Sequence, residues 1–103
     1  MQPSDTLKIE SLGDGWRDKD TVMLHACFQL LKGCVEKENL LNGHTDWNVD
    51  AKHIEVRNEL ELLYKWWLQR MTNEDQCGMT EEEYSSDDEM LHRLIKVRWA
   101  LWT

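Results

Sequence analysis

The chain has 103 residues, a formal net charge of −8, and 41% hydrophobic beside 31% charged residues. This length predicts one domain with a modest core, and the composition is typical of a globular chain rather than a disordered one. The acidic balance disfavours direct binding to duplex DNA, because affinity for phosphates needs a basic patch.

The scarcity of helix breakers favours helix, since Pro occurs once and Gly five times. No run of 18 apolar residues occurs, and the first 20 residues lack both a basic start and an apolar stretch, so we expect neither a membrane span nor a secretory leader. Three Cys, an odd number, predict free thiols and a cytoplasmic location rather than a disulfide framework.

Residues 1–17 are mostly polar and include Gly13 and Gly15, so we predict a poorly ordered N-terminal arm. Residues 18–103 are predicted to form a single helical domain. Its first helix begins after Asp18 or Asp20, either of which can cap the first turn. Apolar residues then recur at the spacing of one helical face. They are Leu24, Cys27, Phe28, Leu31, Cys34 and Val35. The helix is predicted to run to about Asn39.

A polar linker follows, LLNGHTDWN at residues 40–48, in which Asn-Gly signals a turn. A second helix is then predicted, capped by Asn48 or Asp50. It is the longest periodic segment of the chain. Its apolar stripe consists of Val56, Leu60, Leu63, Trp67 and Met71.

An acidic loop is predicted near residues 72–86. Eight carboxylates lie between positions 74 and 89 without an intervening Lys or Arg. Such a run is typical of a solvated segment, and the alternative is a specific acidic docking surface. Two capping boxes compete for the start of a third helix, one at Thr80 with Glu83 and one at Ser86 with Glu89. The third helix is predicted to continue to the C-terminus.

Established catalytic motifs are missing from the sequence. It contains no P-loop, no dinucleotide fingerprint, no G-x-S-x-G and no His-Glu-x-x-His. The paired Glu-x-x-Glu and Glu-x-x-Asp patterns of all-helical nucleotide pyrophosphohydrolases are also absent. We therefore predict no reaction, although a Cys–His pair could still meet in space.

Two groups of residues contain the atoms of a metal site. His25, Cys27, Cys34 and His44 have the right atoms for zinc, but the two Cys lie two helical turns apart, roughly 10 Å, which is too far to share one ion. Buried thiols are the simpler interpretation.

Asp50 with His53, and Glu89 with His92, each resemble half of a di-iron carboxylate site, but three helices supply too few ligands. Ion pairs and caps account for both pairs. We predict neither a metal nor another cofactor.

Aromatic residues exceed what one small core needs, with six Trp in the chain. Trp66 lies about 100° around its helix from Trp67, so it is predicted to pack on another helix or a partner subunit, or to stack on a ligand. Tyr64 and Arg70 are its polar neighbours. Trp99 and Trp102, with Arg98 beside them, are predicted to dock within the domain or into another copy of the chain.

The linker is the other candidate site, because binding residues concentrate on loops. His44, Asp46 and Trp47 combine hydrogen-bonding groups with an aromatic plane. The structural alternative is that Thr45 and Asp46 make turn hydrogen bonds while Trp47 covers the helix ends.

Four segments together carry a resemblance to a known family. They are DTVMLHACFQLL (20–31), GHTDWN (43–48), ELLYKWW (61–67) and DEMLHRLIKVRWALWT (88–103). They resemble a family of small, acidic, uncharacterised proteins of tailed bacteriophages. The resemblance implies a viral origin and the host cell cytoplasm, and it brings no established catalytic or binding residue.

We predict an all-α fold of three main helices in a small bundle, completed by homo-oligomerisation through Trp66, Trp99 and Trp102. The expected function is that of a non-catalytic phage accessory protein that binds a host factor, such as a component of a bacterial defence system. Two alternatives stay open. One is an oligomeric sponge for a nucleotide signal, which would use Arg70 beside Trp66 or Arg98 beside Trp102. The other is a small metal-dependent hydrolase built from His25, His44, His92 and the acids.

Overall fold

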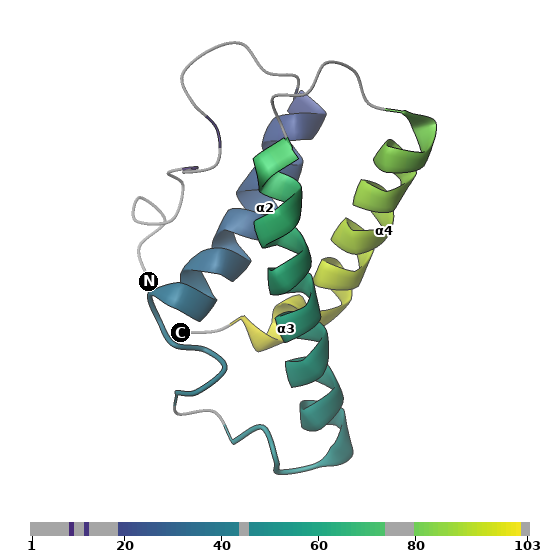
Figure 1. Cartoon of the computed structure of the whole chain (residues 1–103). Coiled ribbons are helices and arrows are strands. Elements are labelled where there is room, and N and C mark those ends of the chain that lie inside the picture. Colours follow the sequence, from purple (N-terminus) through teal and green to yellow (C-terminus); the bar gives the residue numbers. More distant parts are fainter. Residues whose placement is uncertain (1–8, 10–11, 13–18, 44–45, 74–79, 102–103) are drawn as a thin grey trace.

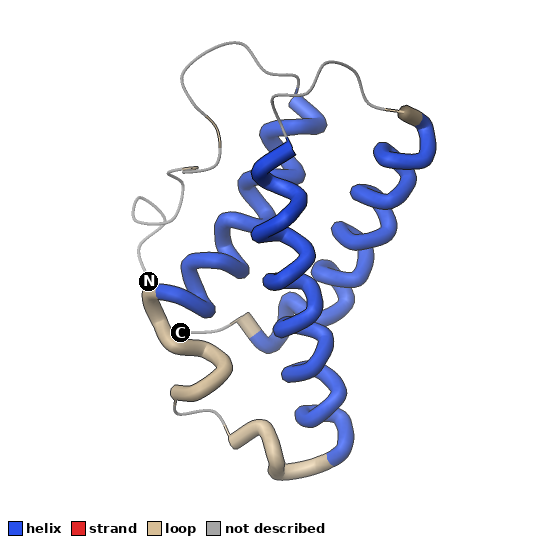
Figure 2. Tube along the Cα trace, viewed as in Figure 1, coloured by secondary structure: helices blue, strands red, loops and turns tan. Residues whose placement is uncertain are grey.

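The structure, a computed structural model, describes residues 9, 12, 19–43, 46–73 and 80–101. Its helices are α2 (Lys19–Glu36), α3 (Ala51–Arg70) and α4 (Glu81–Val97), with the short 3-10 helices η1 (Met71–Asn73) and η2 (Arg98–Ala100) (Figure 1). The described residues contain no strand (Figure 2). The predicted all-α fold with three main helices is confirmed. Of the predicted arm, only Ile9 and Leu12 are described, and both are half-buried.

The helix α3 is the shared partner of the other two. It runs antiparallel to both α2 and α4, which run in the same direction as each other (Figure 1). Each of them packs against α3, and they also contact one another. The core therefore lies where three helix faces meet.

The core consists of apolar residues from all three helices, and on α2 and α3 they follow the predicted stripes. On α3, Val56, Leu60, Leu63 and Trp67 are buried, while Met71 is half-buried. On α2, four of the six predicted residues are buried, namely Leu24, Phe28, Leu31 and Cys34. On α4 and η2 the buried apolar residues are Met90, Leu94, Val97 and Ala100.

An aromatic cluster occupies the interface between α2 and α3. The ring of Phe28 stacks on Trp67 with centroids 5.0 Å apart, and the fully buried His25 meets the same indole edge-on at 4.6 Å. Such contacts add to the free energy gained by burying the rings. The indole Nε1 of Trp67 is buried and has no hydrogen-bond acceptor within the described part of the chain.

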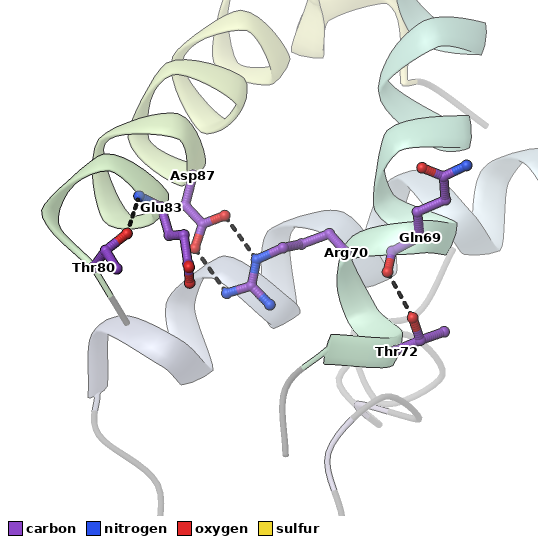
Figure 3. Close-up of polar contacts among 6 residues, drawn as sticks. All are labelled: Gln69, Arg70, Thr72, Thr80, Glu83 and Asp87. Carbon is purple, nitrogen blue, oxygen red and sulfur yellow. Dashed lines mark hydrogen bonds and ion pairs between the residues drawn. The ribbon is translucent and has the colours of Figure 1, made fainter. Parts of the chain in front are cut away.

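Side-chain caps fix the starts of α3 and α4. Asp50 accepts a hydrogen bond from the His53 amide at 2.8 Å, and Thr80 accepts one from the Glu83 amide at 3.1 Å (Figure 3). The structure thus uses the first of the two predicted capping boxes. Residues 81–86 consequently belong to α4 and not to the predicted acidic loop.

The first helix ends three residues earlier than predicted. Asn39 has a positive φ of 54°, and the Leu40 amide donates to the Cys34 carbonyl at 3.0 Å. A left-handed residue followed by such a backward hydrogen bond terminates a helix, and Asn tolerates this conformation better than most residues. The third helix also stops early, because α4 ends at Val97 and η2 follows it.

Charged side chains join α3 to α4 at two points. Arg70 and Asp87 form a bidentate ion pair, with Nε–Oδ1 at 2.7 Å and Nη2–Oδ2 at 2.8 Å (Figure 3). Both side chains are nearly buried, at 15% and 10% exposure. Further along α4, the Arg93 guanidinium also binds both carboxylate oxygens of Glu59. These pairs fix how the two helices lie against each other.

Candidate binding site at the linker

The linker between α2 and α3 is a tight backbone turn. The Asn42 amide donates to the Asn39 carbonyl at 3.2 Å, which closes the turn. A Cβ atom added at Gly43 would lie 2.8 Å from the same carbonyl oxygen. Only glycine fits there without displacing the backbone, so the Asn-Gly signal in the sequence reflects a real steric requirement.

Trp47 holds the linker against the helix ends. Its side chain is 4% exposed, and its Nε1 donates a hydrogen bond to the Leu40 carbonyl at 3.1 Å. Asp46 accepts a hydrogen bond from the Asn48 amide at 3.0 Å, which makes a local turn. Asp46 and Trp47 therefore make the contacts that the structural alternative predicts. Thr45 and the candidate His44 lie outside the described residues.

A hollow of about 410 Å³ lies between this linker and α3. It is lined mainly by hydrogen-bonding side chains from the two segments. The lining residues are Leu41, Asn42, Gly43, Asp46, Trp47, Asn48, Ile54, Arg57 and Asn58. The linker thus brings its two described candidates, Asp46 and Trp47, to the wall of a hollow. We call this feature the linker hollow.

The walls of the linker hollow offer both donors and acceptors. Asn42, Asn48 and Asn58 each carry an amide that donates and accepts, Asp46 accepts, and Arg57 donates. Arg57 is half-buried and lies 3.4 Å from Glu61 one turn along α3, a long contact that leaves it other donors. The hollow is therefore suited to a ligand that both donates and accepts hydrogen bonds.

An exposed apolar side chain stands at the edge of the hollow, and another lies on the neighbouring segment of the chain. Ile54, which also lines it, is 43% exposed, and Val49 in the adjoining linker is 61% exposed. Burying either one against a partner would remove apolar surface from water. The sequence did not indicate Arg57, Asn58 and Asn42 as site residues. A polar residue outside an apolar stripe looks like ordinary surface until the fold shows which residues face it across the hollow.

The second group of candidates, on α3, turns mostly inward. Trp66 is half-buried and packs on Phe28, with ring centroids 5.2 Å apart. Tyr64 donates its hydroxyl to Glu36 at 2.6 Å, which raises the pKa of Tyr64 to about 12. Arg70 directs its guanidinium to Asp87. Arg70, the cation that a nucleotide sponge would use beside Trp66, thus forms an ion pair between helices.

The third group, near the C-terminal end, contains an exposed aromatic residue. Trp99 is 40% exposed, with the Lys52 ammonium 4.8 Å from its ring centroid and the His53 ring edge-on at 5.7 Å. The neighbouring Arg98 is exposed, and Trp102 lies outside the described residues. Trp99 thus docks partly within the chain, against the start of α3.

The described thiols, Cys27 and Cys34, are both weak acids. Burial, aided by the Glu38 carboxylate, raises the pKa of Cys34 to about 12, and burial also raises the pKa of Cys27. A raised pKa opposes formation of the thiolate that a nucleophile needs. Among the described residues, no three His, Cys, Asp or Glu side chains gather closely enough to hold a metal ion.

None of the helices in the described ranges is both long and apolar enough to cross a membrane. Comparisons of the chain with models of protein families, with curated proteins and with solved structures found no match.

Proposed function

We propose that this chain is a non-catalytic binding protein that recognises a host protein through the linker hollow. The observation that supports the proposal is the hollow itself, which is walled by hydrogen-bonding side chains from two segments and edged by Ile54. In keeping with the phage resemblance, the proposal places the chain in the host cytoplasm as an accessory protein that modulates a host machine or a defence system.

The chemistry of the walls fits a protein segment as ligand. Each Asn amide can donate and accept at once, as the peptide groups of an exposed loop also do. Asp46 and Arg57 can pair with a charged side chain of either sign, and Ile54 and Val49 add apolar contact. This mixture of polar and apolar groups is usual at non-obligate protein interfaces.

The hollow is also fixed before binding. Trp47 binds the Leu40 carbonyl at the start of the linker, and Gly43 sets the turn, so few of the described groups need to become ordered on association. A preformed site loses less affinity to conformational entropy than a mobile loop does.

The test uses the full chain, immobilised and exposed to an extract of host cells, followed by purification of any retained protein and titration calorimetry. Asn58→Arg would fill the hollow with a long side chain. Gln69→Arg is the matched control, because it makes the same change on an exposed part of α3 away from the hollow. We expect the wild type and Gln69→Arg to bind the same host protein, and Asn58→Arg to raise the dissociation constant at least about tenfold. In this binding test, equal affinity of Asn58→Arg and the wild type, or no retained host protein, would overturn the proposal.

Native mass spectrometry of the protein from infected cells distinguishes the two alternative functions. A nucleotide-sized mass on an oligomer would support the sponge instead, and a stoichiometric metal would support the hydrolase.

A further inference from the structure

The neighbouring edges of α2 and α4 are defined by one hydrogen bond. Tyr84 on α4 donates its hydroxyl to Asp20 on α2 at 2.6 Å, and the two helices run in the same direction (Figure 1). Residues seven positions further along a helix share the same edge. Cys27 follows Asp20 by seven positions, and Leu91 follows Tyr84 by seven. Both are half-buried, as expected where two helix edges adjoin.

Exposed apolar residues stand just outside this seam. On α2, Met23 is 57% and Leu30 is 40% exposed, and their spacing of seven places them on one line. On α4, Ile95 is 52% exposed and lies one turn beyond Leu91. We define the α2–α4 face by Met23, Cys27, Leu30, Tyr84, Leu91 and Ile95. It is an apolar strip along two helices, and the side chains of α3 do not cover its outer residues.

The charges beside this strip are separated along α4. The exposed residues up to its middle include Glu81, Asp88 and Glu89, whereas Lys96 near its end and Arg98 at the start of η2 are exposed cations. A twofold axis across the strip makes the two α4 helices antiparallel. The acidic half of each helix would then lie along the basic end of the other.

Helix periodicity gives this arrangement a specific contact. Asp88 and Lys96 lie on the outer side of Ile95, and an antiparallel pair centred near His92 places Asp88 opposite Lys96 of the partner subunit. The symmetric pair forms a second time across the axis. A symmetric parallel pair of α4 helices would instead place each of these charges opposite the same charge of the partner.

We propose that a second copy of this chain covers the α2–α4 face, forming a twofold homodimer with antiparallel α4 helices. In this dimer the α2–α4 face makes the contact between copies that the sequence assigned to Trp66. Trp66 instead packs on Phe28 within its own chain. It is independent of the linker hollow, whose residues come from α3 and the preceding linker.

The first test measures the mass of the full chain by sedimentation velocity across a dilution series. We expect the wild type to have twice the 12.3 kDa mass of one chain. Ile95→Glu should raise the dimer dissociation constant at least about tenfold, because it buries a charge in the strip. Leu62→Glu is the matched control, since Leu62 is 45% exposed but lies on α3, and it should leave the dimer intact.

Charge exchange tests the antiparallel geometry. Asp88→Lys and Lys96→Glu should each weaken the dimer, because each places like charges opposite one another. The double variant Asp88→Lys/Lys96→Glu should restore it, since the exchanged charges attract again. Circular dichroism checks that every variant keeps its helix content. A monomeric wild type, a dimer unaffected by Ile95→Glu, or a double variant without restoration would each overturn the proposal.

Discussion

Trp47, near the end of the linker, makes one buried hydrogen bond back to the first linker residue, Leu40. Replacement of Trp47 by Phe keeps an aromatic ring but removes the donor to the Leu40 carbonyl and leaves unfilled volume. We expect the free energy of unfolding to fall by about 2 kcal/mol. Urea denaturation followed by fluorescence measures this. Val49→Ala is the control, because Val49 is 61% exposed, and it should change stability by less than about 0.5 kcal/mol.

The chain has only two tyrosines, and both donate to carboxylates. The contact with Glu36 raises the pKa of Tyr64 to about 12, and the contact with Asp20 raises the pKa of Tyr84. The phenolate absorbance of the folded protein should therefore rise above pH 10 and not around it. Glu36→Gln should lower the pKa of Tyr64, whereas Glu38→Gln should not. A titration unchanged by Glu36→Gln would contradict the observed contact.

The raised pKa of Tyr64 determines in which direction the stability of the fold changes with pH. Its pKa is higher in the folded chain than the value of about 10 expected when unfolded, so the folded state holds the proton more tightly. The stabilisation is complete below pH 10 and is lost as the pH rises towards 12.

The start of α4 depends on Thr80, which is the cap that the structure selects between two equivalent sequence signals. Thr80→Ala should cost about 1 kcal/mol, because the Glu83 amide loses its acceptor. Ser86→Ala is the matched control and should cost less than about 0.5 kcal/mol, since position 86 is an exposed site inside the helix. Thermal unfolding of both variants measures these losses. Equal losses of stability in Thr80→Ala and Ser86→Ala would contradict a helix that begins at Glu81.

The ion pair of Arg70 and Asp87 is one of the contacts that attach α4 to α3. Asp87→Ala leaves a nearly buried guanidinium without this partner, and we expect a loss of about 3 kcal/mol. Glu61→Ala is the control, because the Lys65 side chain of its ion pair is 71% exposed, and it should cost less than about 1 kcal/mol.

A double variant tests whether the loss of stability comes from the unpaired charge of Arg70. Arg70→Met with Asp87→Leu should recover part of the loss, because two apolar side chains leave no unpaired charge. Denaturant unfolding of the three variants provides the comparison, and an additive double loss would contradict this explanation.

The periodic apolar residues predict the three helices correctly because a helix buries one face, and spacing reveals that face directly. The choice between Thr80 and Ser86 was beyond the sequence, since both offer a hydroxyl with an acid three residues on. The angular position of Trp66 predicted contact with another helix, a partner subunit or a ligand, and the packed helices show the first of these, because Phe28 of α2 reaches it. The linker hollow depends on two walls, and the sequence specified only one.

Acid should destabilise the molecule through carboxylates with lowered pKa values. The Tyr84 hydroxyl, with the Thr21 amide, lowers the pKa of Asp20, and the His53 amide and ring lower that of Asp50. Because the folded pKa lies below the unfolded value near 4, their stabilisation is present above pH 4 and is lost as the pH falls further. Asp20→Asn should make the unfolding midpoint less dependent on pH below 4, whereas Glu55→Gln, on the exposed surface of α3, should not.

The central position of α3 has a consequence for the order in which the chain assembles. α2 and α3 are consecutive, and together they already contain the packed rings of Phe28, Trp66 and Trp67. During synthesis this helical hairpin leaves the ribosome first, whereas α4 emerges only afterwards. We therefore expect the nascent chain to collapse around its aromatic cluster, with the docking of α4 as the final and most readily reversed step.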